Sequence, residues 1–257
     1  MKWLLGVTRA TLVLIVLVVG CLLIVAVAPF GLKRKGIPLA NWIPVGMGRL
    51  VMLFFNIKLI CPERDRFYGH DGFLAPNHVS FVDIVVLAAL LPVRFLAAVE
   101  VKQRPVLGWA AAAAGTVFVD RSDIRSRREA LVRIEEAYAS NHQPPIVVFP
   151  EGRLGTGTEL SNFQLGMFKL AKTQRIAYMP VAIDYDRLDI AVWHGRAGET
   201  LLQAGWKLAT FRGPLRVTVT PLPVVHPTPD DNAAQLADAA HDQIAALLGL
   251  PPVETGR

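Results

Sequence analysis

The pattern of hydrophobic and polar positions changes near residue 60. From Leu12 to Phe30 every residue is apolar, Gly or Pro, and a helix needs about 17–25 such residues to cross a bilayer. The basic triplet Lys33-Arg34-Lys35 follows this run. The sequence therefore predicts an N-terminal membrane helix. A cleaved signal peptide is the alternative, because Ala26-Val27-Ala28 has the small-x-small form of a cleavage site.

A second apolar stretch runs from Trp42 to Leu59 and is interrupted by Pro, Gly and polar residues. It predicts an interfacial or re-entrant helix that lies against the first, with Trp42 at headgroup depth. The alternative is a core helix of the domain that follows. We expect residues 1–60 to form the membrane-anchoring part of the chain.

From about Lys58 onward, short apolar runs alternate with stretches of helical periodicity. The predicted strands cover residues 72–75, 94–98, 116–119, 145–149, 177–183 and 215–221. The predicted helices cover residues 81–90, 106–114, 124–140, 166–173 and 232–248. Ser122 or Asp123 is a candidate cap of the third helix. The pattern indicates an α/β domain at 61–250, with a mostly parallel sheet flanked by helices, and a loose tail at 251–257.

Charge is distributed as unevenly as hydropathy. The first 62 residues contain seven Lys or Arg and no Asp or Glu, whereas the rest of the chain contains 20 basic and 21 acidic residues. A basic excess within the most apolar quarter favours anionic lipid headgroups over nucleic acid, which needs a basic patch on the folded domain. The two cysteines and the scattered histidines form no metal-ligand motif. We therefore expect neither a nucleic-acid partner nor a metal.

The sharpest local pattern is Asn77-His78-Val79-Ser80-Phe81-Val82-Asp83, which joins a predicted strand to a predicted helix. Residues five apart on a regular helix point about 140° apart. His78 can therefore meet Asp83 only if it precedes the first turn and folds back, with Ser80 as a candidate cap. Such a pair makes a general base at the carboxyl edge of a parallel sheet. The alternative is an unrelated His and Asp near a loop.

Two further predicted strands also end in charged residues. The strand at 116–119 leads to Asp120 and Arg121, and Arg121 can hold a phosphate through its planar fork or form a surface ion pair. The strand at 145–149 leads to Pro150-Glu151-Gly152-Arg153. Gly152 permits a turn whose N–H groups face an anion, and Arg153 adds positive charge. Backbone N–H groups near Gly152 are also candidates to stabilise an oxyanion.

These stretches, with Met179-Pro180-Val181-Ala182-Ile183, resemble in order and separation the four blocks of the glycerolipid acyltransferase family, typified by bacterial 1-acylglycerol-3-phosphate acyltransferases. The resemblance spans residues 72–183. It implies that His78 is the general base and Asp83 its partner. It also implies that Arg121 and the Glu151-Gly152 turn hold the headgroup of the acceptor, and Arg153 lies next to that turn.

The resemblance implies an acyltransferase of phospholipid biosynthesis. Such an enzyme moves a fatty acyl chain from acyl-CoA or acyl carrier protein to the free hydroxyl of a lysophospholipid, here lysophosphatidic acid. No cofactor is expected beyond the thioester co-substrate. The expected partners are membrane lipids, the lysolipid acceptor and the thioester carrier. The expected location is the cytoplasmic membrane, with the active domain on the cytoplasmic side.

Three departures from the family pattern leave a second kind of acceptor open. Arg153 falls one place early, Gln164 replaces a lysine in Phe163-Gln164-Leu165-Gly166, and Ala97-Ala98-Val99-Glu100-Val101 also lacks its lysine. With fewer cations, a less anionic acceptor such as a lyso-ornithine lipid or a lysophosphatidylcholine-like lipid is the alternative. Two other classes stay open: a lipid hydrolase, in which water replaces the hydroxyl, and a non-catalytic membrane scaffold that binds lipid.

Overall fold

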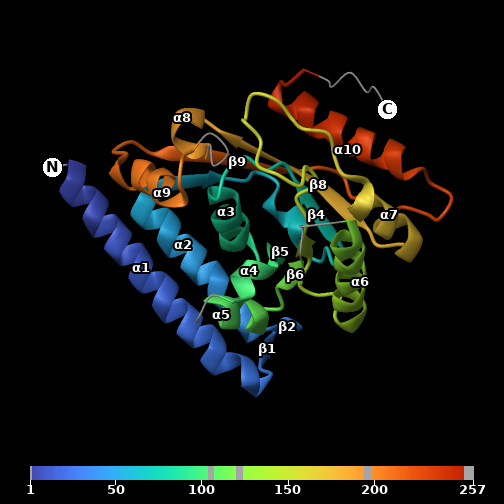
Figure 1. Cartoon of the computed structure of the whole chain (residues 1–257), viewed down its shortest axis with the longest axis horizontal. Helices are drawn as coiled ribbons and strands as arrows, with labels where there is room; N and C mark the ends of the chain where they lie inside the picture. Colours follow the sequence, from blue (N-terminus) through green and yellow to red (C-terminus); the bar gives the residue numbers. More distant parts are fainter. Residues whose placement is uncertain (1, 104–106, 120–123, 194–197, 252–257) are drawn as a thin grey trace.

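The computed structural model describes residues 2–103, 107–119, 124–193 and 198–251. Within them a seven-stranded sheet has the order β3-β9-β8-β4-β7-β5-β6, with helices on both faces (Figure 1). The strands are β3 Ile57–Ile60, β4 Phe73–Pro76, β5 Arg94–Ala98, β6 Val117–Val119, β7 Ile146–Val147, β8 Tyr178–Tyr185 and β9 Leu215–Pro221. Neighbours run parallel except β8 and β9. The predicted α/β fold with a mostly parallel sheet is confirmed.

The five helices predicted between residues 81 and 248 are present, each with its ends within one residue of the expected position. The longer helices are α1 Lys2–Val27, α2 Ile43–Phe55, α3 Val82–Leu90, α5 Leu107–Ala113, α6 Ile124–Ser140, α7 Leu165–Gln174, α9 Leu201–Thr210 and α10 Ala233–Leu248. Short elements are η1 Ala28–Phe30, β1 Lys33–Arg34, β2 Ile37–Pro38, η2 Leu39–Asn41, η3 Arg64–Phe67, α4 Val99–Lys102 and α8 Leu188–Ala191. Helix α9 was not predicted, although Thr200 and Gln203 form a capping box at its start.

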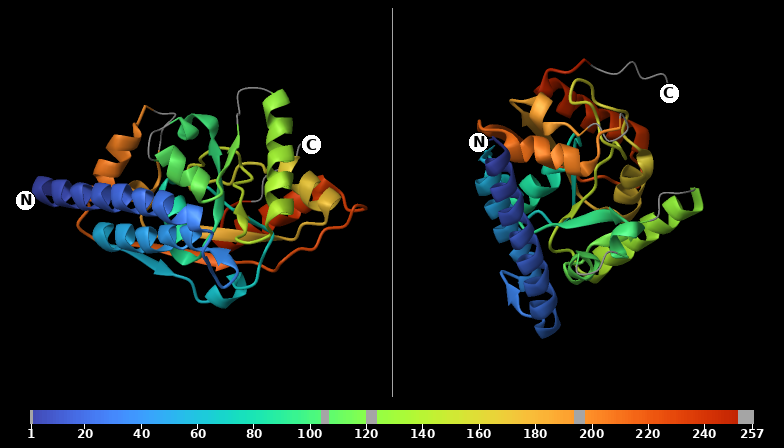
Figure 2. Two further views of the ribbon diagram at one scale, coloured as in Figure 1. Left: turned by 90° about the horizontal axis from the view of Figure 1, so that it is seen from below. Right: turned by 60° about the vertical axis from the view of Figure 1, so that its left-hand side comes forward.

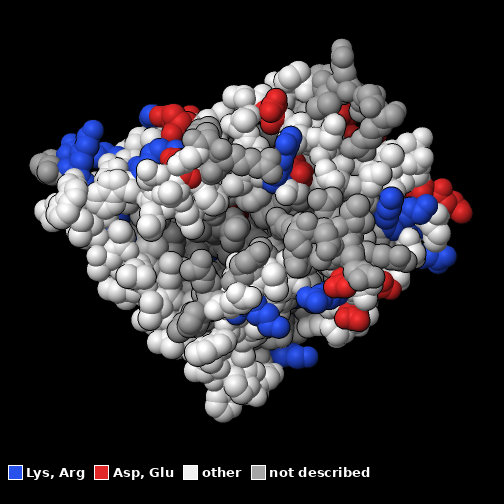
Figure 3. All heavy atoms as spheres, viewed as in Figure 1, with Lys and Arg blue, Asp and Glu red and all other residues white. Residues whose placement is uncertain are grey.

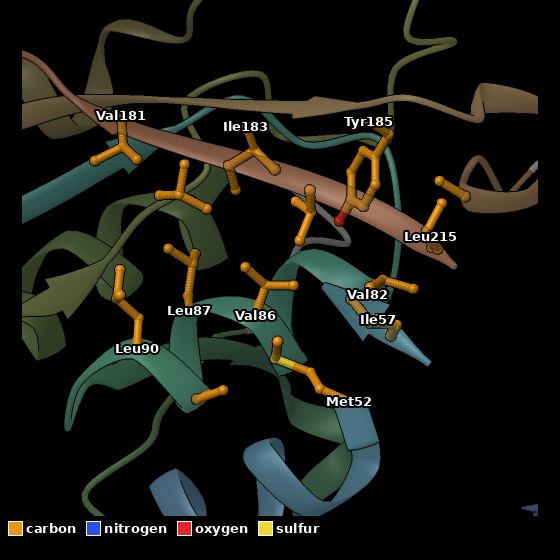
Figure 4. Close-up of a cluster of buried hydrophobic side chains, with 14 of the residues drawn as sticks. Met52, Ile57, Val82, Val86, Leu87, Leu90, Val181, Ile183, Tyr185 and Leu215 are labelled. Atoms are coloured by element: carbon orange, nitrogen blue, oxygen red, sulfur yellow. The ribbon is translucent and has the colours of Figure 1, made fainter. Parts of the chain in front are cut away.

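The strands supply two cores, one on each face of the sheet. Because successive residues of a strand point to opposite faces, β4 gives Leu74 to one core and Phe73 to the other. The first core includes α2, α3 and α9, and Figure 4 shows its side chains between β8 and α3. The second includes α6, α7 and α10. Burial on both faces explains why the strands are continuous apolar runs in the sequence.

Helix α1 packs along its length against the domain. It lies beside α2, and its N-terminal end lies beside α9 (Figure 2). Arg9 donates to the carbonyls of Ala209 and Phe211 near one end, and Cys21 and Ile24 are buried toward the other. Among the described residues, α1 with η1 is the one segment long and apolar enough to cross a membrane. These contacts favour a retained helix over a cleaved signal peptide.

The stretch from Trp42 to Leu59 forms a helix and then a strand. Helix α2 ends at Phe55, Asn56 adopts a left-handed conformation with φ 56°, and β3 joins the sheet beside β9. Val51 and Met52 belong to the main core, as the core-helix alternative expects, whereas Leu50 and Leu53 on the same helix are exposed, as an interfacial helix requires. The predicted boundary at residue 60 falls at the end of β3. Residues 252–257 of the predicted tail lie outside the described residues.

Candidate functional site

The carboxyl ends of the parallel strands open at one edge of the sheet, and two predicted site segments meet there. His78 follows β4, and Glu151 follows the adjacent strand β7. This is the edge at which open α/β sheets bind ligands. Arg121, expected beside them, lies outside the described residues together with Ser122 and Asp123.

His78 and Asp83 meet in the way that their spacing required. His78 precedes the first turn of α3, and its Nδ1 lies 2.8 Å from Oδ2 of the fully buried Asp83. The same oxygen accepts the backbone N–H groups of Val79 and Ser80, each at 2.9 Å. Ser80 Oγ in turn accepts the N–H of Val82 at 3.1 Å. The carboxylate thereby fixes the loop and the imidazole together.

Tyr185 is a third member of this cluster that the sequence did not reveal. Its side chain extends from β8 toward α3 (Figure 4), and its hydroxyl donates to Asp83 Oδ1 at 2.6 Å. Burial, followed by the charge of Asp83, raises the pKa of Tyr185 well above its usual value. Tyr185 therefore stays protonated and remains a donor, so both oxygens of Asp83 are hydrogen-bonded.

The ring of His78 is held from the side by Phe149. The two rings stack with centroids 3.8 Å apart and an angle of 20° between their planes. The His78 side chain is 16% exposed, and its Nε2 has no hydrogen bond to a described residue. With Nδ1–H directed at Asp83, Nε2 is the free acceptor that a general base needs.

Asn77 anchors the start of the loop to β8. Its Nδ2 donates to the Ile183 carbonyl at 3.0 Å, and its Oδ1 accepts the Ile183 N–H at 2.7 Å. These bonds tie the end of β4 to the strand that carries Tyr185. The Asn of the sequence motif therefore has a structural explanation.

Both carboxylate oxygens of Glu151 are hydrogen-bonded to the protein itself. The residue is 3% exposed, its Oε1 accepts the backbone N–H of His78 at 2.7 Å, and its Oε2 accepts that of Ser161 at 3.1 Å. Burial raises the pKa of this carboxyl, and the two amide hydrogen bonds partly offset that rise. A carboxylate would repel a phosphate, so this geometry supports the loop. Its headgroup role stays a prediction that the contacts do not favour.

The turn after Glu151 closes beside His78. Gly152 has φ +67°, as expected for a glycine turn, but its N–H donates to the Phe149 carbonyl and is not free. Gly155 N–H donates to the His78 carbonyl at 2.7 Å. The exposed Arg153 contacts Ser161 Oγ at 3.2 and 3.3 Å and lines an open cavity of about 670 Å³.

Comparisons with known proteins show which proteins this chain resembles. A family model described as Acyltransferase matches residues 58–184. A lyso-ornithine lipid O-acyltransferase of Pseudomonas aeruginosa is 38% identical over 43% of this chain and 42% of its own length. A 1-acyl-sn-glycerol-3-phosphate acyltransferase of Neisseria gonorrhoeae is 33% identical over 56% of this chain and 54% of its own length. The matches thus span about half the length of these relatives.

The fold matches a solved structure over nearly its whole length. The crystal structure of the 1-acyl-sn-glycerophosphate (LPA) acyltransferase PlsC of Thermotoga maritima superimposes with a TM-score of 0.73 at 17% identity, covering 97% of each chain. The sheet, the paired His78 and Asp83 and the matched segment together define an acyltransferase domain. The chain belongs to the glycerolipid acyltransferase family, and with its apolar α1 it is a membrane-associated protein.

Proposed function

We propose that this protein transfers a fatty acyl chain from an acyl thioester to the free hydroxyl of a lysophospholipid. The observation that carries the proposal is the 2.8 Å contact of His78 Nδ1 with buried Asp83, which leaves Nε2 unbonded among the described residues. Family membership supports the same reaction class. The transfer needs no cofactor beyond the thioester, which acyl-CoA or acyl carrier protein supplies.

In the proposed reaction, the lysolipid hydroxyl oxygen attacks the thioester carbonyl carbon as His78 Nε2 takes the hydroxyl proton. The tetrahedral intermediate then collapses, the C–S bond breaks, and the His78 imidazolium returns the proton to the departing thiolate. Asp83 keeps its hydrogen bond to Nδ1–H and stabilises the imidazolium. Because Tyr185 and two amides also donate to Asp83, its orientation does not change during the cycle.

The oxyanion of this intermediate needs hydrogen-bond donors close to His78. The Gly152 amide is bonded to Phe149, so we assign this role to the next two amides, of Arg153 and Leu154. Neither donates a hydrogen bond to a described residue. The Gly155–His78 bond at 2.7 Å keeps this turn next to the imidazole.

Lysophosphatidic acid is the first candidate acceptor. Its phosphate would be held at the rim of the 670 Å³ cavity by Arg153, and by Arg121 if that side chain faces the same edge. Val119, Leu131 and Met167 line the same cavity and offer apolar surface to a chain. The Neisseria relative, named for this reaction, supports the assignment.

A lyso-ornithine lipid is the second candidate. Arg153 is the one Lys or Arg among the described residues that line the cavity, and Gln164 lies there instead of the lysine of the family pattern. A single cation suits a less anionic headgroup. The Pseudomonas relative, named for that reaction, supports this alternative.

The test is thiol release by purified, detergent-solubilised protein. Palmitoyl-CoA or palmitoyl acyl carrier protein is supplied with lysophosphatidic acid, with lyso-ornithine lipid or with no acceptor. We expect release that requires an acceptor and falls by about 10²–10⁴-fold in His78→Ala. His142→Ala is the matched control, because His142 is exposed and stacks on Tyr138.

Each outcome of this assay has a meaning. The acceptor used faster names the lipid substrate. Release without any acceptor would replace the proposal with a lipid hydrolase. No release with either donor would overturn the proposed function and favour a lipid-binding scaffold. Full activity in His78→Ala would overturn the assignment of His78 as the general base. We also propose that the active domain faces the cytoplasm, where both thioester donors occur; protease protection in closed vesicles tests the side.

A further inference from the structure

A second cavity lies at the opposite edge of the sheet. Its volume is about 430 Å³, within the range of small-molecule sites. Segments that precede three strands form one wall: residues 67–70 before β4, 90–92 before β5, and 143 and 145 before β7. The hairpin β1–β2 and helix α2 form the other wall. The cavity is therefore separate from the His78 site, which lies at the carboxyl ends of these strands.

Cations dominate the polar lining of this cavity. Four Lys or Arg side chains and no Asp or Glu are among its lining residues; the cations are Arg34, Lys35, Arg49 and Arg64. Three separate segments supply them, namely the hairpin, α2 and η3. The guanidinium of Arg34 also stacks on Trp42, 4.9 Å from the ring centroid, and Trp42 lines the cavity as well. Such a concentration of positive charge favours an anionic ligand.

Arg64 has hydrogen-bonding capacity that the described protein does not use. Its Nη2 donates to the Leu90 carbonyl at 2.6 Å, but its Nε is buried with no partner among the described residues. A buried N–H without an acceptor costs free energy, so native structures rarely contain one. Arg49 similarly gives its Nε to the Ala89 carbonyl at 3.2 Å. Most of the five N–H donors of each guanidinium remain available.

Arg94 shows how a structural arginine differs from Arg49 and Arg64 in the number of its nitrogens that are hydrogen-bonded. Arg94 is buried, whereas Arg64 is partly buried and Arg49 is exposed. The three nitrogens of Arg94 donate to the carbonyls of Pro144, Ala137 and Asn141 at 2.7–2.9 Å. Arg49 and Arg64 do contact the last carbonyls of α3, a favourable place for cations. That capping role uses one donor from each, so it explains neither the free Nε of Arg64 nor the additional cations of the hairpin.

The surroundings of the cavity identify a lipid as the source of the anion. Phe30 and Leu32, immediately before β1, are 74% and 56% exposed, and α2 exposes Leu50 and Leu53. These side chains continue the apolar surface of α1, which is white along almost its whole length in Figure 3. Ile37 and Val45 add apolar lining inside the cavity. A charged cavity beside a membrane-contacting surface matches a phosphate group joined to a lipid.

We propose that this cavity binds the phosphate of an anionic membrane phospholipid and so docks the protein on a bilayer at a defined position. The ligand fits against Arg34, Arg49 and Arg64, with Lys35 at the hairpin. This site does not depend on acyl transfer, since no residue of the His78 cluster lines it. The +6 net charge of the chain would attract it to any anionic bilayer, and the cavity adds a site for one phosphate group.

The experiment is a calorimetric titration of the full, detergent-solubilised chain with short-chain phosphatidylglycerol. This lipid is neither acceptor nor product of the proposed reaction, so binding and catalysis can fail independently. Phosphatidylcholine of the same chain length and inorganic phosphate are the comparison ligands. We expect saturable binding of one phosphatidylglycerol, equal in wild type and His78→Ala, and no comparable binding of the other two.

Two double variants test the residues. Arg34→Gln/Lys35→Gln and Arg49→Gln/Arg64→Gln should each weaken binding by about tenfold or more, as loss of charge-assisted hydrogen bonds predicts. Lys33→Gln/Lys58→Gln is the matched control. It removes two exposed charges from the same quarter of the chain, and neither residue lines the cavity. The control should bind like wild type.

Several results would overturn the proposal. One is equal weakening in the control and the cavity variants, which would mean diffuse attraction only. Equal affinity for phosphatidylcholine would exclude recognition of charge. Inorganic phosphate binding as tightly as phosphatidylglycerol would mean a free-phosphate site. If Arg49→Gln/Arg64→Gln loses helical circular dichroism, Arg34→Gln/Lys35→Gln, which leaves the α3 contacts intact, decides the question.

Discussion

The polar side chains at the two edges of the sheet differ in how far their hydrogen bonds are satisfied within the protein. At the carboxyl edge the polar groups satisfy one another: Asp83 accepts four hydrogen bonds and Glu151 accepts two. At the amino edge the lining charges share one sign, and Arg64 Nε has no described partner. Proton transfer needs one atom held in a fixed place, whereas ligand capture needs donors left free. Completeness of hydrogen bonding therefore distinguishes the two kinds of site.

The largest effect should come from Asp83→Asn. The amide of asparagine cannot accept from all the groups that now donate to the carboxylate, so the His78 tautomer and the loop lose their support. We expect turnover to fall by roughly a thousandfold or more in the thiol-release assay. Asp242→Asn is the control, because Asp242 contacts His241 at 3.2 Å on α10 but is 63% exposed. Turnover of Asp83→Asn within tenfold of wild type would contradict the assigned pairing.

Glu151→Ala tests whether the carboxyl edge is held by internal hydrogen bonds. The change leaves the backbone N–H groups of His78 and Ser161 without their acceptor and should lower the free energy of unfolding by about 2–4 kcal/mol. Denaturant unfolding measures the loss, and the exposed Glu159→Ala should stay within about 0.5 kcal/mol of wild type. If stability is unchanged but the acceptor KM rises, Glu151 has the headgroup role expected from the sequence.

Tyr185→Phe should have an intermediate effect on activity. It removes the 2.6 Å hydrogen bond to Asp83 while keeping the apolar ring in the core. A fall in kcat of about tenfold, with KM unchanged, is expected from loss of one hydrogen bond to a charged group. Tyr178→Phe is matched, because Tyr178 is on the same strand but packs on the other face, where its hydroxyl contacts the Leu236 carbonyl. Equal losses in both variants would make Tyr185 merely structural.

The smallest effect should be the stability change in Arg49→Gln. Arg49 donates to the Ala89 carbonyl in the last turn of α3, and a cation there contributes about 0.3–1 kcal/mol. A shift of that size in denaturant unfolding, which shrinks at high salt, would agree with a mainly electrostatic contact. A loss of several kcal/mol would instead make Arg49 a structural arginine like Arg94, and would weaken the contrast between the two edges.

The sequence predicted the elements of this fold better than the contacts between them. The strands at 94–98 and 215–221 and the helix at 124–140 match the structure at both ends, because apolar runs and helical periodicity are local signals. Strand β3 was missed because Ile57, Leu59 and Ile60 extend the apolar stretch of α2, and Asn56 resembles the other polar interruptions of that stretch. Strand β7 is only two residues long, although five were predicted.

The same division applies to the candidate site. The spacing of His78 and Asp83 was enough to predict their meeting, since both belong to one loop and the helix after it. Tyr185 lies 102 positions from Asp83 and two residues beyond the predicted strand at 177–183, so no local pattern connected it to the site. Glu151 was predicted to lie at the site, but its burial depends on amides of two other segments. The sequence alone does not show these distant contacts.

Asn77 acts as a surrogate peptide group. Its side-chain amide offers one donor and one acceptor to Ile183, as another residue of a strand would, and so continues the ladder of β4 past its last residue. Aspartate has the same length but no donor, and glutamine has the right groups one methylene too far out. The geometry of the sheet, rather than the reaction, therefore explains the Asn of the motif. By holding the end of β4 against β8, Asn77 fixes where the next residue, His78, leaves the sheet.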